Sequence, residues 1–282
     1  MSSRRPHLTP WKAAGKRTER GTTADQVVRD TGWVFNNETG NTLTLEQFVE
    51  TGNAEVDKYL RRFGLMATAG SKSIVEIGSG IGRMTAALTN VFETVVATDI
   101  DAAFLERCRE TVAKFGNTST LRTSHIADGR TIALPSQSFD VVFSYITLQH
   151  CKHDDALALT AEAYRIVKPG GRLILNYRTW VLSDALLIPL SAIMRVLWHT
   201  PVIGEPLSRW RWSTRLGWQA NRLSPRQVYA HLESLGVQLE TPKAFSGGIR
   251  ARRPVSIGAT QVLQDEFPMG NKSHWWLVAH RS

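Results

Sequence analysis

From residue 73 onward, short runs rich in β-branched residues alternate with segments whose apolar residues have helical spacing. The runs that predict strands are SIVEI (73–77), TVVATDI (94–100), STLRTSHI (119–126), FDVVFSYI (139–146) and RLILNY (172–177), and the segments that predict helices are 84–92, 102–116 and 154–167. Such alternation indicates βαβ units, in which each helix returns the chain to the same edge of a parallel sheet. We therefore predict an α/β fold with a doubly covered, mostly parallel sheet.

Capping signals predict helices on both sides of this core. Thr44 and Gln47 have capping-box spacing, and a further helix is expected to begin after Asn53 and to stop at Gly64. Asp154 is the expected N-cap of the helix over 154–167, and Lys168-Pro-Gly-Gly171 is expected to stop it. Ser224, followed by Pro225, predicts another helix start, and WWLVAH (275–280) predicts a last strand.

These signals divide the chain into five predicted parts. They are a disordered basic tail (1–24), an N-terminal helical cap (25–70), the core (71–177), an insertion (178–222) and the rest of the sheet (223–282). The net charge of +9 favours anionic partners such as nucleic acid, a membrane surface or an acidic substrate. Two cysteines are too few for a disulfide framework, which favours a reducing, cytoplasmic location. The most apolar stretch, 181–198, is interrupted by Asp184, Pro189 and Arg195, so we expect no membrane span. Its helical character is expected to break at Pro189.

A glycine-rich loop, Gly78-Ser-Gly-Ile-Gly82, follows the first predicted strand and leads into a helix. Glycines allow a sharp turn and a close approach of the backbone to a ligand, because no Cβ intrudes. The spacing is G-x-G-x-G, and Arg83 stands where a dinucleotide-binding loop would have its third glycine. The loop therefore favours a ligand other than a dinucleotide pyrophosphate.

Two acidic positions follow neighbouring strands at the same edge of the sheet. Asp99 ends the second strand, where a carboxylate can accept both hydroxyl protons of a ribose. Asp128 and Gly129 follow the third strand, where a carboxylate could accept a hydrogen bond from the exocyclic amine of adenine. The carboxyl ends of parallel strands form the ligand-binding edge of an open α/β sheet.

Four ordered segments resemble the motif set of class I S-adenosylmethionine (SAM)-dependent methyltransferases. They are EIGSGIG (76–82), VVATDID (95–101), IADGRTIALPSQSFDVVFS (126–144) and EAYRIVKPGGRLIL (162–175). The resemblance implies a Rossmann-like fold with a seven-stranded, mostly parallel sheet, an antiparallel last strand (275–280), helices on both faces and an insertion after the fifth strand that serves as a lid. It also implies SAM as the cofactor, held by Glu76, Gly78, Ser79 and Gly80 at the methionine part, Asp99 at the ribose, and Ile100, Asp128 and Gly129 at the adenine.

The catalytic side is expected after the fourth strand, in the segment that contains His150 and His153. A hydroxyl acceptor benefits from a base, and histidine titrates near neutral pH, so His150 is the first candidate for general base and His153 the second. The alternative to a catalytic role is a structural one, in which the histidine is hydrogen-bonded under the loop. His150, His153 and Asp154 could also hold a divalent ion, but histidine is an unusual Mg²⁺ ligand, so a metal is not favoured. Cys151 is expected to be a structural thiol.

The insertion contains the most unusual composition of the chain, RWRWSTRLGW (209–218). Residues 178–222 have six arginines, two acids and five of the nine tryptophans. Trp210, Arg211 and Trp212 are the predicted acceptor-binding residues, since indoles stack on sugar rings and arginines donate to hydroxyls. The same composition would also suit contact with RNA, with a lipid surface or with a second copy of the chain. The structural alternative is a lid whose indoles are buried against the core.

These observations predict a SAM-dependent methyltransferase that modifies a hydroxyl of a sugar, a glycolipid or another small metabolite. The end of the fourth strand reads Ser144-Tyr-Ile-Thr147 and lacks the Asn-Pro-Pro-Tyr segment of amino methyltransferases, which makes a nucleic-acid acceptor less favoured. An RNA or a lipid or quinone methyltransferase, and a regulatory protein that binds SAM without catalysis, remain the alternatives. Peripheral membrane contact and a homodimer are the further partner expectations.

Overall fold

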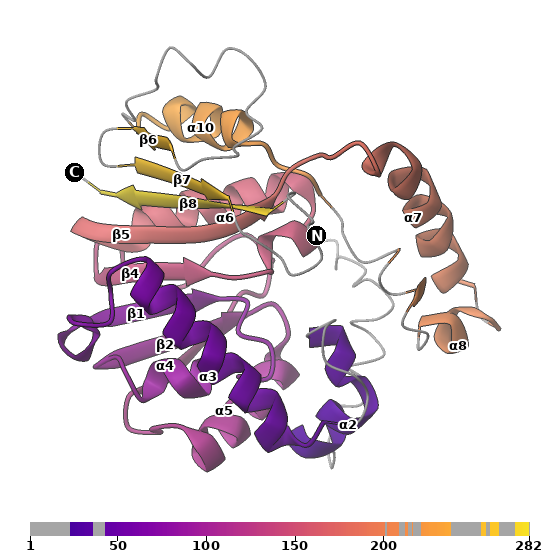
Figure 1. The fold of residues 1–282 in the computed structure, drawn as a ribbon, viewed down its shortest axis with the longest axis horizontal. Coiled ribbons are helices and arrows are strands. Elements are labelled where there is room, and N and C mark those ends of the chain that lie inside the picture. Colours follow the sequence, from indigo (N-terminus) through magenta and orange to yellow (C-terminus); the bar gives the residue numbers. More distant parts are fainter. Residues whose placement is uncertain are drawn as a thin grey trace. The chain divides into compact units, whose positions relative to one another are not determined.

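The computed structural model describes residues 23–35, 43–200, 202–208, 212–213, 216, 221–237, 255–257, 260–264 and 274–281. The chain divides into two compact units. Unit 1 comprises Met1–Asp128 and Leu186–Gln219, and unit 2 comprises Gly129–Ala185 and Ala220–Ser282. Figure 1 labels the helices and strands of both units.

Unit 1 contains three parallel strands in the order β3-β2-β1. They are β1 (Ser73–Ile77), β2 (Thr94–Asp99) and β3 (Leu121–His125), paired in register from Ser73↔Thr94 and from Val95↔Leu121. Strand β1 is almost entirely buried, as its continuous apolar run predicts. The strand ends bring Gly78, Asp99 and the residues after His125 to one edge of this unit.

The helices of unit 1 follow the predicted order, with one correction. They are α2 (Ala24–Phe35), α3 (Leu45–Arg62), α4 (Thr85–Thr89) and α5 (Ala102–Phe115). Thr44 and Gln47 form the predicted capping box of α3. The predicted second helix start at Asn53 is wrong, because α3 runs through it without a break and the Asn53 amide bonds Glu50 within the helix. The predicted stop at Gly64 holds, with φ at +64° just after the helix.

Unit 2 contains five strands in the order β4-β5-β8-β7-β6. Strands β4 (Phe139–Ser144) and β5 (Val167–Arg178) are parallel, whereas β8 (His274–His280) runs antiparallel to β5. Strands β7 (Thr260–Gln264) and β6 (Val255–Ile257) continue the antiparallel pairing. The antiparallel last strand is thus confirmed. The described residues hold eight strands, one more than predicted, because the segment before β8 supplies both β6 and β7.

Three helical elements of unit 2 are η2 (Leu148–His150), α6 (His153–Ile166) and α10 (Pro225–Ser234). Of these, α6 and α10 lie close to predicted helices, and η2 was not predicted. Ser224 and Gln227 form a capping box at α10, with Pro225 at its first position as predicted. The prediction of Asp154 as N-cap is wrong: Lys152 is the N-cap of α6, and Asp154 lies in the first turn, where its charge suits the helix dipole. The Lys168–Gly171 segment does stop α6, but it already belongs to β5.

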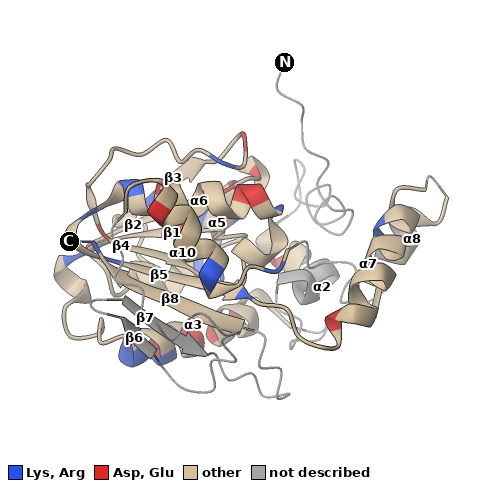
Figure 2. Cartoon of the chain, turned by 90° about the horizontal axis from the view of Figure 1, so that it is seen from above, with Lys and Arg blue, Asp and Glu red and all other residues tan. Residues whose placement is uncertain are grey.

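Two helices lie in the insertion, α7 (Asp184–Trp198) and α8 (Gly204–Ser208). The prediction of a break at Pro189 is wrong, since α7 continues through it. Proline removes one backbone donor from a helix, a cost that tertiary contacts can offset. Here Ser191 Oγ donates to the carbonyls of Leu187 and Leu216, and Trp198 Nε1 donates to Ser213 Oγ at 2.8 Å. Figure 2 shows that α7 is nearly free of charged residues along its length.

Candidate active site

The glycine loop between β1 and α4 depends on three left-handed backbone positions. Gly78, Gly80 and Gly82 have φ values of 81°, 55° and 92°, where a side chain would be strained. The backbone N–H groups of Gly78 and Ser79 both donate to the Thr98 carbonyl, at 2.8 and 3.0 Å. The loop is therefore pinned to the end of β2, close to Asp99.

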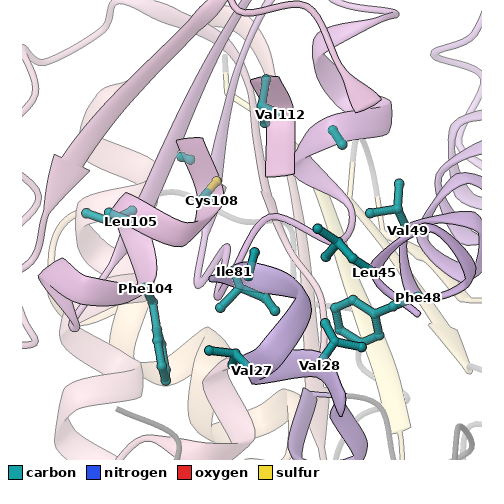
Figure 3. Packing of buried hydrophobic residues seen from close by; sticks show 13 residues of the cluster. Val27, Val28, Leu45, Phe48, Val49, Ile81, Phe104, Leu105, Cys108 and Val112 are labelled. Atoms are coloured by element: carbon teal, nitrogen blue, oxygen red, sulfur yellow. The ribbon is translucent and has the colours of Figure 1, made fainter. Parts of the chain in front are cut away.

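Ile81 anchors this loop in the core of unit 1. Its side chain is buried in a cluster with residues of α2, α3 and α5 and lies among Val27, Val28 and Phe48 in Figure 3. Next to it, a Cβ added to Gly82 would lie 3.0 Å from the Cα of Cys108. The third glycine thus permits α5 to pack directly against the loop. This explains the predicted G-x-G-x-G spacing by packing as well as by ligand access.

Arg83 fastens the loop to α3, a role that the sequence analysis did not anticipate. Its guanidinium forms an ion pair with Glu55 at 2.6 Å and donates to Thr51 Oγ1 at 3.3 Å. A Cβ added to Gly52 would lie 2.1 Å from the Arg83 carbonyl oxygen, so α3 needs a glycine at that point. The signal available in the sequence was a glycine inside a helix, which often marks a close backbone approach.

Asp99 lies where the sequence placed it, at the carboxyl end of β2. Its Oδ2 accepts a hydrogen bond from the Gly80 N–H at 2.9 Å, and its Oδ1 accepts one from the Asp101 N–H at 3.0 Å. Burial raises the pKa of this carboxyl to about 6, against the lowering effect of these backbone donors. Each carboxylate oxygen can accept a second hydrogen bond, so hydroxyl donors can still be recognised.

Glu76 is the second buried acid at this edge. It is 5% exposed, and Thr85 Oγ1 donates to its Oε2 at 2.6 Å. Burial raises the pKa of Glu76 to about 7, while the charge of Arg83 lowers it and that of Asp99 raises it further. Because Arg83 is already ion-paired with Glu55, the two buried acids form a local excess of negative charge.

The remaining predicted adenine contacts follow β2 and β3. Ile100 is 44% exposed, an unusual state for a large apolar residue beside a buried strand. The backbone around it is fixed, because His125 Nε2 bonds the Ile100 carbonyl at 3.1 Å and the Ile126 N–H donates to the Asp99 carbonyl at 2.8 Å. Asp128 is exposed two residues later, and Gly129 has φ at +70°, at the boundary of the two units.

These residues fit the groups of SAM. Among the residues that the structure describes, no ion pair is made by either of the two buried carboxyl groups with raised pKa values, which suits the ammonium of the methionine part and the hydroxyls of a ribose. The exposed Ile100 offers an apolar face to a flat ring. Unit 1 thus brings Glu76, Ser79, Gly80, Asp99 and Ile100 together, as the sequence predicted.

His150 lies in unit 2 on the short helix η2, which follows β4. Its Nε2 is 3.3 Å from the side-chain nitrogen of Gln149. Gln149 Oε1 is buried without a hydrogen-bond partner. Exchanging the amide oxygen and nitrogen, which are hard to distinguish, would let Oε1 accept from His150 Nε2–H and leave Nδ1 with the lone pair. In that orientation, Nδ1 would be the ring nitrogen of His150 that can accept a proton.

Asn221, which the sequence analysis did not single out, holds the turn that carries His150. Its Nδ2 donates to the carbonyls of Leu148 at 2.6 Å and Cys151 at 2.8 Å, and its backbone N–H donates to the Gln149 carbonyl at 3.2 Å. Asn221 is buried at the end of the insertion. The carbonyls on either side of His150 are thus satisfied by one residue that lies 71 positions later in the chain.

Ile146, just before η2, has φ at +51°. This conformation is strained for a β-branched residue, and such strain often accompanies functional sites. The residue before it, Tyr145, stacks on Trp276 with 5.6 Å between ring centroids. The turn from β4 to η2 is therefore rigidly built on both sides of the strained residue.

A buried ionic cluster ties the start of the insertion to its end within unit 2. Asp184, at 0% exposure, accepts from Arg178 at 3.2 Å and from two nitrogens of Arg222 at 2.7 and 3.0 Å. Burial and the charge of Arg222 lower the pKa of Arg178 to about 10. Nearby His274 is buried, and desolvation together with Arg178 and His150 lowers its pKa to about 3. His274 is therefore neutral at physiological pH.

The structure gives less support to His153, the second candidate for general base, and to the metal site than to His150. His153 is about half exposed and lies 3.1 Å from the carboxylate of its neighbour Asp154, which is largely exposed. In the part of the chain that the structure describes, no group of three or more His, Cys, Asp or Glu side chains could hold a metal ion. The set of His150, His153 and Asp154 is therefore not assembled there.

Of the three predicted acceptor-binding residues, the structure describes only Trp212. Trp210 and Arg211 lie outside the described residues. Trp212 is 54% exposed, whereas the adjacent Ser213 is buried and accepts from Trp198. An exposed indole is thus present at the predicted position.

Comparisons with known proteins identify the core. Residues 75–175 match the family model described as "Methyltransferase domain". An uncharacterized methyltransferase of Mycobacterium bovis is 33% identical over 108 residues, covering 38% of this chain and 51% of that protein. A carboxy-S-adenosyl-L-methionine synthase of Pseudomonas fluorescens is 33% identical over 108 residues, covering 36% and 44%. The chain spans about half or less of the length of these curated relatives.

Two solved structures share the fold across most of the chain. Magnesium protoporphyrin IX methyltransferase from Synechocystis PCC 6803, with bound SAH, has a TM-score of 0.54 at 15% identity and covers 92% of this chain and 98% of that one. A SAM-dependent methyltransferase from Methanococcus maripaludis has a TM-score of 0.50 at 17% identity, with 90% and 94% covered. Residues 75–175 thus match a methyltransferase domain, and the two solved structures show that the chain has a Rossmann-like methyltransferase fold.

Proposed function

We propose that the chain is a SAM-dependent methyltransferase that acts on a hydroxyl of a sugar, a glycolipid or another small metabolite. The observation that carries the first half of this proposal is the pair of buried acids at the glycine loop. Glu76 and Asp99 have raised pKa values and form no ion pair with any residue that the structure describes, so a cationic ligand with hydroxyl groups would relieve an unfavourable arrangement.

The chain's own residues have separable roles in holding this cofactor. Asp99 accepts from the ribose hydroxyls while it keeps the Gly80 N–H in place. Glu76 faces the methionine part, Ile100 packs on the adenine, and Asp128 with Gly129 borders its exocyclic amine. When bound, SAM supplies a methyl group on a sulfonium, which is already activated for transfer. The protein must therefore chiefly align the acceptor and exclude water.

His150 is proposed as the residue that accepts the proton of the acceptor hydroxyl. A hydroxyl is a weak nucleophile at neutral pH and gains from a positioned base. The support is local: Asn221 fixes the turn that carries His150, and the Gln149 side chain contacts His150 Nε2. His153 is about half exposed, and its ring nitrogens contact the side chains of Asp154 and Gln227, so its position supports the role of base less well.

The acceptor class rests on the composition of the insertion. Trp210, Arg211 and Trp212 are proposed to contact the acceptor, with indoles for the faces of sugar rings and guanidinium donors for hydroxyls. The exposed indole of Trp212 supports this role. The end of β4 reads Ser144-Tyr-Ile-Thr147 and lacks the Asn-Pro-Pro-Tyr segment of amino methyltransferases, which disfavours methylation of an exocyclic amine of nucleic acid.

A methyl-transfer screen with radiolabelled SAM tests this function. The substrates are glycans, glycolipids, phenols and RNA, and each positive is repeated with Asp99→Ala and His150→Ala. We expect label on a hydroxylated acceptor that both variants reduce, with cofactor affinity reduced only by Asp99→Ala. SAM binding without label on any acceptor would favour a regulatory protein, and label on RNA bases would contradict the acceptor class.

A further inference from the structure

Helix α7 and the residues before it expose a continuous apolar stripe. We define the α7 stripe as five side chains with 4-4-3-3 spacing, which places them on one face of the helix and its N-terminal extension. They are Leu182, Leu186, Leu190, Ile193 and Val196, which are 81%, 67%, 39%, 58% and 67% exposed.

The opposite face of α7 is already occupied. Met194 and Trp198 are buried, Ser213 donates to Met194 Sδ at 3.1 Å, and Ser191 donates to the Leu216 carbonyl. The helix is therefore apolar on two sides, and the described residues cover only one of them. A helix that is apolar all round normally has apolar surroundings on every side.

Exposed apolar side chains are concentrated at this segment. Of the twelve large hydrophobic residues that are exposed in the described part of the chain, ten lie between Trp180 and Trp212. Val202 and Ile203, which precede α8, are 82% and 48% exposed. Trp180 and Trp212 are each about half exposed. Single exposed apolar residues are ordinary, but a contiguous group of this size marks an interaction surface.

The charge of the segment decides which occupant suits this surface. Residues 178–222 have six arginines against two acids, and Asp184 is paired with Arg178 and Arg222. Apolar residues and tryptophans accompanied by arginines are typical of helices that lie in the interface of an anionic membrane. No helix in the described part of the chain combines the length and apolar character needed to cross a bilayer.

We propose that the α7 stripe docks this protein on the surface of an anionic lipid bilayer. Helix α7 has 15 residues, about 22 Å, and would lie in the plane of the interface. Its leucine, isoleucine and valine side chains would enter the boundary of the acyl chains, and the net positive charge of the insertion would favour an anionic surface. This inference is independent of methyl transfer, and it would place the protein beside lipid-linked molecules.

Vesicle flotation of the full-length protein tests the proposal. Vesicles of phosphatidylcholine alone are compared with vesicles that also contain phosphatidylglycerol, at low and high salt. We expect the parent protein to float with the anionic vesicles and to bind less at high salt. Leu186→Asp/Ile193→Asp should lower the bound fraction at least about tenfold, because two inserted side chains are lost. Leu235→Asp, which changes an exposed leucine at the end of α10, is the matched control and should bind like the parent.

Three results would overturn the proposal. They are no binding of the parent to anionic vesicles, equal binding of the double variant, and a dimer by light scattering that the double variant abolishes, which would make the stripe an interface between copies. If the double variant melts at a lower temperature than the parent, Leu182→Asp replaces it, since Leu182 precedes the helix and is the most exposed of the five. Undiminished binding of that variant also counts against the proposal.

Discussion

Asp99 holds Gly80: the Oδ2 atom at the end of β2 accepts the backbone N–H of the glycine loop at 2.9 Å. The acid that is proposed to recognise the ribose therefore also shapes the loop that is proposed to receive the methionine part. Replacing it should affect both the form of the loop and the direct contact with the ligand.

Asp99→Ala should weaken the binding of S-adenosylhomocysteine by about 2–3 kcal/mol, or roughly 30–150-fold, because it removes charge-assisted hydrogen bonds. Isothermal titration calorimetry measures the change. Asp57→Ala, which removes an exposed carboxylate on α3, is the control and should leave the affinity unchanged. Equal affinity of Asp99→Ala and the parent would show that Asp99 does not contact the ligand.

The buried acids predict an unusual pH dependence of stability. Burial raises the pKa of Glu76 from 4.5 to about 7 and that of Asp99 from 3.8 to about 6. The folded chain binds these protons more tightly than the unfolded chain, so the unliganded protein should lose stability as pH rises from about 4 to 7. The loss from Glu76 is on the order of 3 kcal/mol.

Glu76→Gln should remove the Glu76 part of this dependence and should raise the melting temperature above that of the parent at pH 8. Thermal unfolding without ligand, followed across this pH range, measures both effects. The neutral amide keeps an oxygen that can accept the Thr85 hydroxyl proton. A parent profile that rises from pH 4 to 7, or a variant less stable than the parent at pH 8, would show that Glu76 is charged at little cost in the folded protein.

Gly52→Ala should destabilise the protein by about 1–3 kcal/mol and weaken cofactor binding, because the new Cβ would meet the Arg83 carbonyl oxygen at 2.1 Å. Gly70→Ala is the matched control, since its nearest neighbour would lie at 3.9 Å. Chemical denaturation and calorimetry on both variants separate the effects. If Gly52→Ala behaves like Gly70→Ala, the contact of α3 with Arg83 does not position the glycine loop.

His150→Ala should lower turnover roughly 10²–10⁴-fold with cofactor affinity nearly intact, as expected for loss of a general base. Asn221→Ala should also lower turnover, by a smaller factor, because the carbonyls of Leu148 and Cys151 lose their donor. Single-turnover rates with an acceptor from the screen, paired with cofactor titrations, measure both. Activity that survives in His150→Ala and is lost in His153→Ala would assign the base to the other histidine.

Asp184→Asn should destabilise unit 2 by about 3–5 kcal/mol, because it leaves Arg178 and Arg222 buried without their counter-charge. Denaturant unfolding measures the change, with Asp57→Asn, in an exposed ion pair, as a control that should cost less than about 1 kcal/mol. Equal costs of the two substitutions would mean that the Asp184 cluster is open to water.

The residues that could be predicted from the sequence are those whose role follows from local pattern. Alternating runs and helical spacing placed the strands, and the loop after β1 and the acid after β2 were found by their position at strand ends. The helix start predicted at Asn53 was wrong, because a residue type that favours N-cap positions is also tolerated inside a helix whose packing is favourable. Arg83, Asn221 and Asp184 could not be assigned, because each has a partner 28 to 73 positions away that only the fold brings close.

Whether the Glu76–Asp99 edge binds SAM can be measured by calorimetric titration of the parent protein with S-adenosylhomocysteine, with NAD in a parallel titration. We expect S-adenosylhomocysteine to bind in the micromolar range, with an affinity strongly reduced in Asp99→Ala, and we expect no binding of NAD. Binding of NAD, or no binding of S-adenosylhomocysteine by a folded protein, would contradict the assignment of the Glu76–Asp99 edge as a SAM site.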